Sequence, residues 1–205
     1  MAELISLNPY APEPWMVRRV VAAINDGAVL ILPTDTVYAI VCSIEHKGAL
    51  ETIYRIKNSA AGKPLSVLFP DLSSITDYTR GIPNAAFRVM KRTLPGPYTY
   101  ILEASKRLPP GALEKRTTIG CRMPDHPVAL AVLRELATPL LATSVTHDED
   151  NAIDDPIELS TRLGRDVDYV VDAGAIYPQP STIIDFTGPD PVVVREGKGS
   201  LDLFR

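Results

Sequence analysis

The architecture is first indicated by the stretch Ala28-Val29-Leu30-Ile31-Leu32-Pro33-Thr34-Asp35-Thr36. Its first part is continuously apolar, which predicts a strand over 28–32 that is buried on both faces of a sheet. Upstream, residues 14–24 begin with a proline and are followed by Asp26-Gly27, a pattern that predicts a helix with proline in its first turn. In open α/β sheets ligands gather at strand ends, so the polar residues that follow Leu32 are candidates for a binding site.

The rest of the chain alternates helical and strand-like segments, separated by scattered prolines and glycines. Helices are predicted over 47–57, 71–78, 83–94, 126–136 and 156–163. Strands are predicted over 38–42, 65–69, 98–102, 117–122, 140–144 and 169–172, with a hairpin built from 181–186 and 192–195. Helices and strands alternate early and strands cluster late. This order favours an α/β fold of the α+β type, in which helices flank a twisted mixed sheet.

Composition limits the class of protein. The 205 residues, 45% of them hydrophobic and 22% charged, predict one compact domain over residues 1–205. We find neither a signal peptide at the start of the sequence nor an apolar run of the roughly 18 residues that span a bilayer, so no membrane partner is expected. Cys42 and Cys121 lie in apolar, strand-like contexts and are predicted to be buried free thiols. Together these features predict a cytoplasmic protein.

Charge is segregated along the chain. Residues 55–122 contain twelve basic and four acidic side chains, a net charge of +8, within a chain whose formal net charge is -4. Residues 1–54 and 123–205 carry net charges of -3 and -9. A basic middle third can attract an anionic ligand, although the three segments can also neutralise each other in the fold.

Familiar catalytic motifs are missing from the sequence. There is no P-loop, no dinucleotide-binding GxGxxG after a strand and no GxSxG elbow. The histidines are isolated, and the acidic run 147–150 lacks the EF-hand pattern, so no protein-held metal is expected. What remains is a set of hydroxyl and cationic side chains near predicted strand and helix ends. Such a set suits catalysis by positioning and electrostatic stabilisation, as in nucleotidyl transfer.

Several blocks together resemble a known family. They are Pro33-Thr34-Asp35-Thr36-Val37-Tyr38, Ile56-Lys57, Lys63-Pro64-Leu65, Pro95-Gly96-Pro97-Tyr98-Thr99, Gly120 to Pro127, Ala142-Thr143-Ser144, Ser181 to Asp185 and Val194 to Gly197. In this order and spacing the chain resembles the YrdC-like domain, or L-threonylcarbamoyladenylate synthase, family. Within that family it is most similar to the YciO branch. The resemblance implies a twisted sheet with a concave, positively charged opening.

The resemblance also implies an activity and partners. The family's synthases join L-threonine, bicarbonate and ATP into threonylcarbamoyl-AMP and pyrophosphate, for modification of the adenosine beside the anticodon of certain tRNAs. The expected ligands are therefore L-threonine, bicarbonate and ATP or an adenylate. Mg²⁺ is expected to accompany ATP, and no tightly bound organic cofactor is expected.

Matching positions give the candidate site residues. The resemblance implies that threonine is bound by Thr34, Thr36, Arg122 and Ser181, with Arg122 facing its carboxylate as a bidentate fork. It implies that the nucleotide is bound by Lys57, Lys63, Thr118, Ser144 and Arg195, with both lysines at the phosphates. Lys57 and Ser144 are also the candidate catalytic residues. Several of these residues have a structural alternative: Thr34 and Thr36 can form a turn, Ser181 can cap a loop, and Arg195 can pair with Glu196 or a neighbouring strand.

The chain departs from the family at two nucleotide-binding positions. Ser59 stands where the synthases carry arginine, and Thr146 stands where they carry asparagine. Losing one charge-assisted contact commonly costs about 1.5–3 kcal/mol, or roughly 10- to 150-fold in affinity. We therefore expect a synthase activity that is reduced or redirected, including towards hydrolysis of the adenylate.

Two other functions stay open on the sequence alone. One is a protein that binds tRNA or other structured, double-stranded RNA through the basic concave face without catalysis; phosphate-led binding of this kind weakens steeply with salt. The other is a ligand-binding or regulatory domain that has lost its chemistry.

Overall fold

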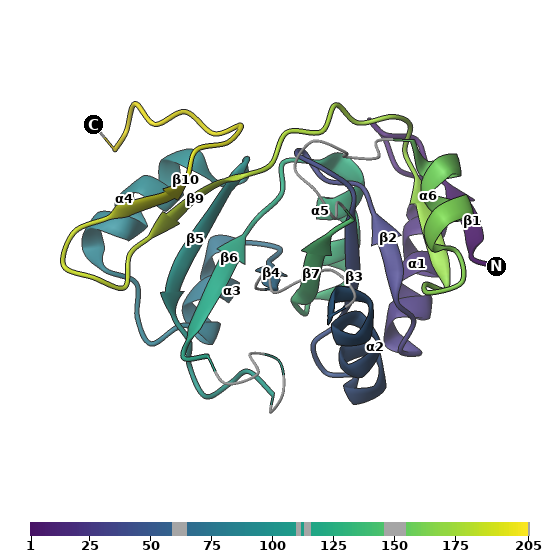
Figure 1. Cartoon of the computed structure of the whole chain (residues 1–205), viewed down its shortest axis with the longest axis horizontal. Helices are drawn as coiled ribbons and strands as arrows, with labels where there is room; N and C mark the ends of the chain where they lie inside the picture. The colour runs from purple at the N-terminus through teal and green to yellow at the C-terminus, as the bar shows by residue number, and fades with distance from the viewer. Residues whose placement is uncertain (59–64, 110–111, 113–115, 146–154, 205) are drawn as a thin grey trace.

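One mixed sheet organises the computed structural model, which describes residues 1–58, 65–109, 112, 116–145 and 155–204 (Figure 1). Within these residues the sheet has ten strands in the order β1-β8-β2-β3-β7-β4-β6-β5-β9-β10. Its strands are β1 (Glu3–Ser6), β2 (Leu30–Leu32), β3 (Ala39–Ser43), β4 (Ser66–Leu68), β5 (Tyr98–Glu103), β6 (Thr118–Arg122), β7 (Leu140–Ser144), β8 (Tyr169–Asp172), β9 (Thr182–Asp185) and β10 (Val192–Arg195). The helices are α1 (Pro14–Asn25), α2 (Lys47–Asn58), α3 (Leu72–Tyr78), α4 (Asn84–Thr93), α5 (Pro127–Leu136) and α6 (Pro156–Leu163).

Parallel and antiparallel pairs are interspersed across the sheet. β8 lies parallel to both β1 and β2, and β4–β6 and β5–β9 are also parallel. The pairs β2–β3, β3–β7, β4–β7, β5–β6 and β9–β10 are antiparallel. The predicted mixed sheet flanked by helices is therefore confirmed, as is the late hairpin.

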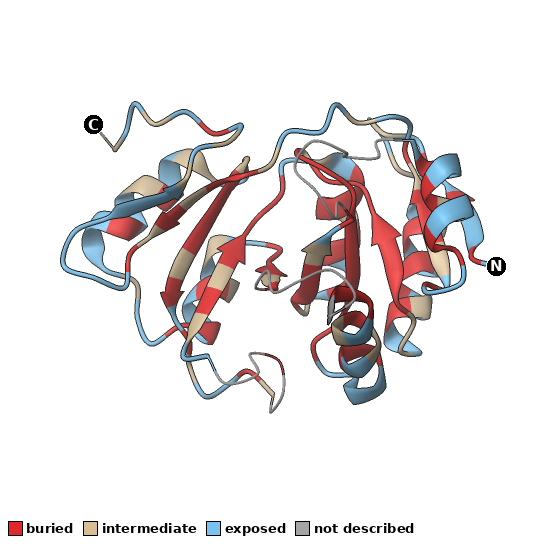
Figure 2. Ribbon diagram, viewed as in Figure 1, coloured by how far each residue is buried: buried red, intermediate tan, exposed pale blue. Residues whose placement is uncertain are grey.

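The strands β8, β2, β3 and β7 form a half of the sheet with a core on each face. Side chains that alternate along β2 separate accordingly: Leu30 and Leu32 join the apolar residues of α1 and α5, whereas Ile31 joins those of α2 and α6. All three residues of β2 are completely buried (Figure 2). The continuous apolar run is thus explained by helices on both sides, although the regular strand is shorter than the predicted 28–32.

The strands β4, β6, β5 and β9 form the other half. On one face α3 and α4 bury Tyr98 and Tyr100 of β5, and Thr93 of α4 is 2.7 Å from the Tyr100 hydroxyl. On the other face the alternate residues Thr99 and Ile101 line a cavity. Period-two alternation in these strands therefore separates a helix-covered face from an open one.

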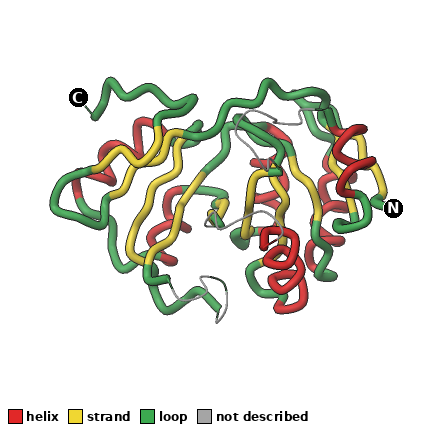
Figure 3. Tube along the Cα trace, in the orientation of Figure 1, coloured by secondary structure: helices red, strands yellow, loops and turns green. Residues whose placement is uncertain are grey.

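Two connections matter for the site. The segment 173–181 connects β8, near one edge of the sheet, with β9, near the other edge (Figure 3). It is anchored at both ends, because the Tyr38 hydroxyl donates to the Gly174 carbonyl (2.7 Å) and the Gln179 amide donates to the Thr36 carbonyl (3.1 Å). No helix in the described part of the chain is long and apolar enough to cross a membrane.

The sequence analysis missed β1. This strand has four residues and lies at the sheet edge, where Glu3, Leu4 and Ser6 are exposed and Ile5 is buried. A single buried residue in so short a segment gives little pattern. The parallel pairing with β8, more than 160 residues away, is what makes it a strand.

Candidate functional site

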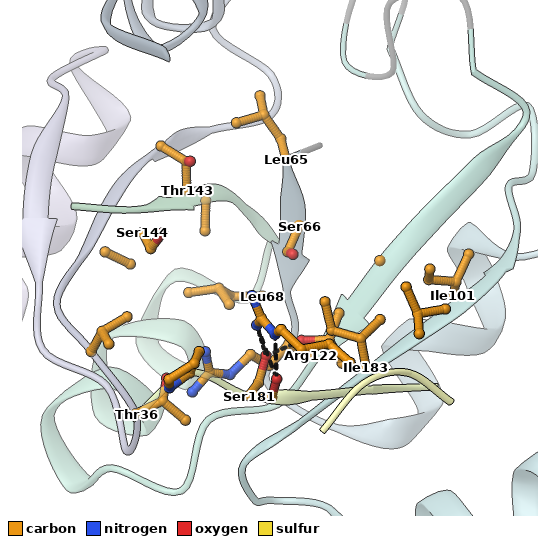
Figure 4. A pocket seen from close by; sticks show the side chains of 18 of the residues that line it. Thr36, Leu65, Ser66, Leu68, Ile101, Arg122, Thr143, Ser144, Ser181 and Ile183 are labelled. Carbon is orange, nitrogen blue, oxygen red and sulfur yellow. Dashed lines mark hydrogen bonds between the residues drawn. The ribbon is translucent and has the colours of Figure 1, made fainter. Parts of the chain in front are cut away.

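A cavity of about 710 Å³ opens on the uncovered face of the second half of the sheet (Figure 4). β4, β5, β6 and β9 contribute residues at their outward-facing positions, and β3, β7, β10, α2 and the loops contribute the remainder. Hydroxyl groups dominate its polar lining: Thr36, Ser66, Thr99, Thr118, Thr143, Ser144 and Ser181. Its described charged residues are Lys57, Arg116, Arg122, Arg195 and Asp185.

Alternation along β6 explains how this lining forms. Ile119 and Cys121 are buried in the core. Thr118, Gly120 and Arg122 face the cavity. Gly120 leaves space on this side of the cavity, because a Cβ at residue 120 would lie 3.2 Å from the Thr99 methyl and 3.3 Å from Ser66 Oγ.

Arg122 is held from behind by the turn after β2. Its Nη2 donates to an Asp35 carboxylate oxygen and to Thr34 Oγ1 (3.3 Å). The side chains of Arg122 and Asp35 are only 9% and 8% exposed. A buried pair of this kind fixes the guanidinium plane. Because Nη2 is already engaged, a ligand carboxylate that meets Arg122 as the predicted fork shares this nitrogen with Asp35.

Thr34 forms the turn that presents Asp35. Its hydroxyl donates to the Val37 carbonyl and accepts from the backbone amides of Thr36 (3.2 Å) and Val37 (3.3 Å). Thr34 is 1% exposed and is not among the residues that line the cavity. The turn role raised as an alternative therefore describes Thr34, whereas Thr36 itself lines the cavity.

Ser181 and Arg195 form a unit with Thr99. Ser181 Oγ lies 2.8 Å from Thr99 Oγ1, and Arg195 donates from Nε (3.1 Å) and Nη2 (2.9 Å) to the Ser181 carbonyl. All three line the cavity. Part of the Arg195 guanidinium is thus used to hold Ser181 in place.

Lys57 enters the cavity from the last turn of α2. It is 6% exposed, and its Nζ lies 5.5 Å from the centroid of the Tyr54 ring, a cation–π distance. The Tyr54 hydroxyl donates to the Ala112 carbonyl at 2.8 Å. This hydrogen bond joins α2 to the connection between β5 and β6.

The structure brings most of the predicted residues together. Seven of them line the single cavity described above: Thr36, Lys57, Thr118, Arg122, Ser144, Ser181 and Arg195. Thr34 supports them from behind. Lys63 lies outside the described residues, as do Ser59, Thr146 and the acidic run 147–150.

The sequence analysis missed other lining residues: Tyr54, Ser66, Thr99, Arg116 and Asp185. Alternation was the available signal for two of them. Thr99 lies two residues before the cavity-facing Ile101, and Asp185 lies at an even spacing from Ser181.

Burial is the main cause of the pKa shifts of His126, Cys42 and Cys121. Burial is the largest cause that lowers the pKa of His126, and Asp35 and Asp125 oppose it. Burial also raises the pKa of Cys42 to about 12 and raises that of Cys121. Both cysteines are free and buried, as predicted, so they are poor nucleophiles at neutral pH. The described residues include no cluster of three or more His, Cys, Asp or Glu side chains suited to a metal ion.

Comparison with known proteins identifies the family. The Sua5/YciO/YrdC family model, which carries the description "Telomere recombination", matches residues 22–197. The chain belongs to this family. The resemblance stated from the sequence motifs is thereby confirmed.

Individual family members add detail. YciO of Escherichia coli K12 is 38% identical over 206 residues, which cover all of both chains. Its crystal structure superposes with a TM-score of 0.92. A putative threonylcarbamoyl-AMP synthase of Methanocaldococcus jannaschii is 32% identical over 176 residues, covering 85% of this chain and 82% of that protein. The similarity to the YciO branch thus extends over the full length.

A member of the family has been solved with an amino acid bound. Sua5 of Pyrococcus abyssi, complexed with L-threonine, is 25% identical with a TM-score of 0.89. The match covers 98% of this chain and 59% of the Sua5 chain. The fold described here is therefore shared with a family member that binds L-threonine.

Proposed function

We propose that this chain is a threonylcarbamoyl-AMP synthase-like nucleotidyltransferase that acts on L-threonine, bicarbonate and MgATP, with activity reduced or redirected relative to a full synthase. One observation carries the proposal. A single cavity unites hydroxyl and cationic side chains from α2, β6, β7, β10 and two loops, at the positions that the family motifs mark.

The proposed reaction needs no side-chain nucleophile. The threonine amine and bicarbonate give a carbamate and water. A carbamate oxygen then attacks the α-phosphorus of ATP, and the bond from that phosphorus to the bridging oxygen breaks. Pyrophosphate leaves with the electron pair of this bond. Cations that neutralise the growing charge on the leaving group stabilise the transition state.

Each wall of the cavity has a proposed role. Arg122, fixed by Asp35, binds the threonine carboxylate, while Ser181, held by Thr99 and Arg195, faces the amino acid. Lys57 faces the phosphates, and Thr118 and Ser144 line the nucleotide site. Lys63 is proposed to join Lys57 on the motif alone. Mg²⁺ is proposed to arrive bound to the ATP phosphates.

The departures at Ser59 and Thr146 are the reason to propose reduced or redirected activity. The same cavity can instead hydrolyse the adenylate. Water attacks the α-phosphorus, the bond from that phosphorus to the carbamate oxygen breaks, and AMP and the carbamate of threonine are released. A site that binds AMP and threonine but holds a triphosphate weakly favours that direction.

The decisive experiment incubates the protein with threonine, bicarbonate and MgATP and measures pyrophosphate and adenylate. A parallel reaction follows the loss of added threonylcarbamoyl-AMP. We expect slow synthesis, loss of the added adenylate, or both. The variant S59R/T146N is expected to raise synthesis, and an unchanged rate would show that these positions are not the cause. Synthesis as fast as a full synthase would contradict the claim of reduced activity.

The absence of both reactions would contradict the enzyme proposal and favour binding. RNA binding through the concave face stays a prediction, and its expected mark is a steep loss of affinity as salt rises. Three of the exposed cations that suggested it, Arg88, Lys91 and Arg92, belong to α4 and are not among the cavity-lining residues.

A further inference from the structure

The α2 end of the cavity is built from two segments that approach each other. Tyr54 and Lys57 come from α2, and Ala112 and Arg116 come from the connection between β5 and β6. The hydrogen bond from the Tyr54 hydroxyl to the Ala112 carbonyl ties the two segments together. Arg116 and Lys57 therefore both line this tied end, one cation from each segment.

The cavity cations differ in how their charge is used. Arg122 is paired with Asp35, and Arg195 donates to the Ser181 carbonyl. Among the described residues, Arg116 makes no ion pair or hydrogen bond through its guanidinium. The lining carboxylate, Asp185, accepts instead from the amide and hydroxyl of Thr187. No described protein group pairs with the positive charge of Arg116, which is therefore available to an anionic ligand.

Distance along β6 separates Arg116 from the amino-acid end. Thr118 and Arg122 are four residues apart in a regular strand, or roughly 13 Å at 3.3 Å per residue, and Arg116 precedes Thr118 by two more. Threonine bound at Arg122 is too small to reach Arg116. A nucleotide that extends along the cavity from the threonine site can place its phosphates there.

We propose that Arg116 is a further substrate-binding residue, which grips the β- and γ-phosphates of the nucleotide from the segment opposite Lys57. The inference rests on the proposed function and deepens it. A guanidinium offers paired N–H donors that match phosphate oxygens, whereas a lysine offers a point charge. Such a contact would also provide a guanidinium at the phosphates in a chain that carries serine at residue 59, where the synthases carry arginine.

The test measures binding by calorimetry with four probes: MgATP, tripolyphosphate, AMP and L-threonine. R116Q is expected to weaken MgATP and tripolyphosphate by about tenfold or more, and to leave AMP and threonine nearly unchanged. R116K, which keeps the charge but not the fork, is expected to recover part of the loss. The matched control is R88Q, which removes an exposed arginine of α4 outside the cavity.

Each outcome decides a separate point. Equal affinity of R116Q and wild type for MgATP overturns the inference and leaves the proposed function standing. An equal loss in R88Q and R116Q also overturns it, because the effect would be general electrostatics. If wild type fails to bind MgATP, the proposed function fails; tripolyphosphate binding that is lost in R116Q then still supports Arg116 as a polyphosphate ligand. Arg116 is exposed, so an unchanged Tm for R116Q excludes misfolding.

Discussion

The half of the sheet formed by β8, β2, β3 and β7 has apolar helices against both faces, whereas β4, β6, β5 and β9 have α3 and α4 on one face and a cavity on the other. The two halves share one continuous sheet. In β2 every side chain is buried. In β6 core residues alternate with cavity residues. Both halves have helices against one face. Whether the opposite face is also covered by helices or lines a cavity decides whether a half serves mainly stability or ligand binding.

The largest expected effect comes from the covered half. Ile31→Ala removes a fully buried side chain, which should lower the free energy of unfolding by about 2–5 kcal/mol. Urea denaturation measures this loss. The affinity of the folded protein for threonine should stay the same, and a large change in affinity would erase the proposed division between the halves.

Gly120→Ala is the matched change in the open half. Its added methyl contacts the Thr99 and Ser66 side chains on the cavity floor, so the free energy of unfolding should change by less than about 1 kcal/mol. Ligand binding should weaken by about tenfold, since one extra methyl group in a fitted pocket is worth this much. Calorimetry with threonine and MgATP measures the loss. Unchanged affinity together with a large loss of stability would mean that residue 120 serves the core.

The smallest effect is expected where the halves meet, at His126 before α5. Because burial lowers its pKa below 6.5, the folded state disfavours the protonated ring and the unfolded state takes up the proton first. The contribution of His126 to stability is therefore present above about pH 6.5 and is lost as pH falls through the lowered pKa. Denaturation at pH 7.5 and 5.5 should show a steeper loss for wild type than for His126→Gln. An equal loss of stability in both proteins between pH 7.5 and 5.5 would show that the His126 ring stays hydrated in the folded state.

Local patterns predicted most of the fold. Proline in the first turn predicted α1, and a continuous apolar run predicted the strand that contains β2. β1 escaped because its stability comes from pairing with a distant strand. Strand order escaped for the same reason: β4 lies between β7 and β6, which are far from it in sequence.

The candidate site was predicted by motif positions, and the structure changes how some of them are understood. Thr34 supports Arg122 through a turn instead of lining the cavity. No motif assigns a ligand to Arg116, and only the tertiary approach of α2 to the β5–β6 connection suggests one. Sequence patterns show where a charged side chain lies along the chain. Whether that side chain is paired or available to a ligand depends on residues from other segments, which the patterns do not reveal.

The contacts of residues 197–199 have a consequence for how the ligand site is assembled. Lys198 Nζ donates to the Asp35 carbonyl across 163 positions of sequence, and Gly197 and Gly199 bind the Thr182 hydroxyl. The turn that holds Arg122 is thus completed by a residue that lies far from it in sequence. Asp35 and Arg122 therefore reach their final positions only when these distant segments have met. A ligand that binds this site binds the assembled fold, so its binding should stabilise contacts between segments that are far apart in the chain.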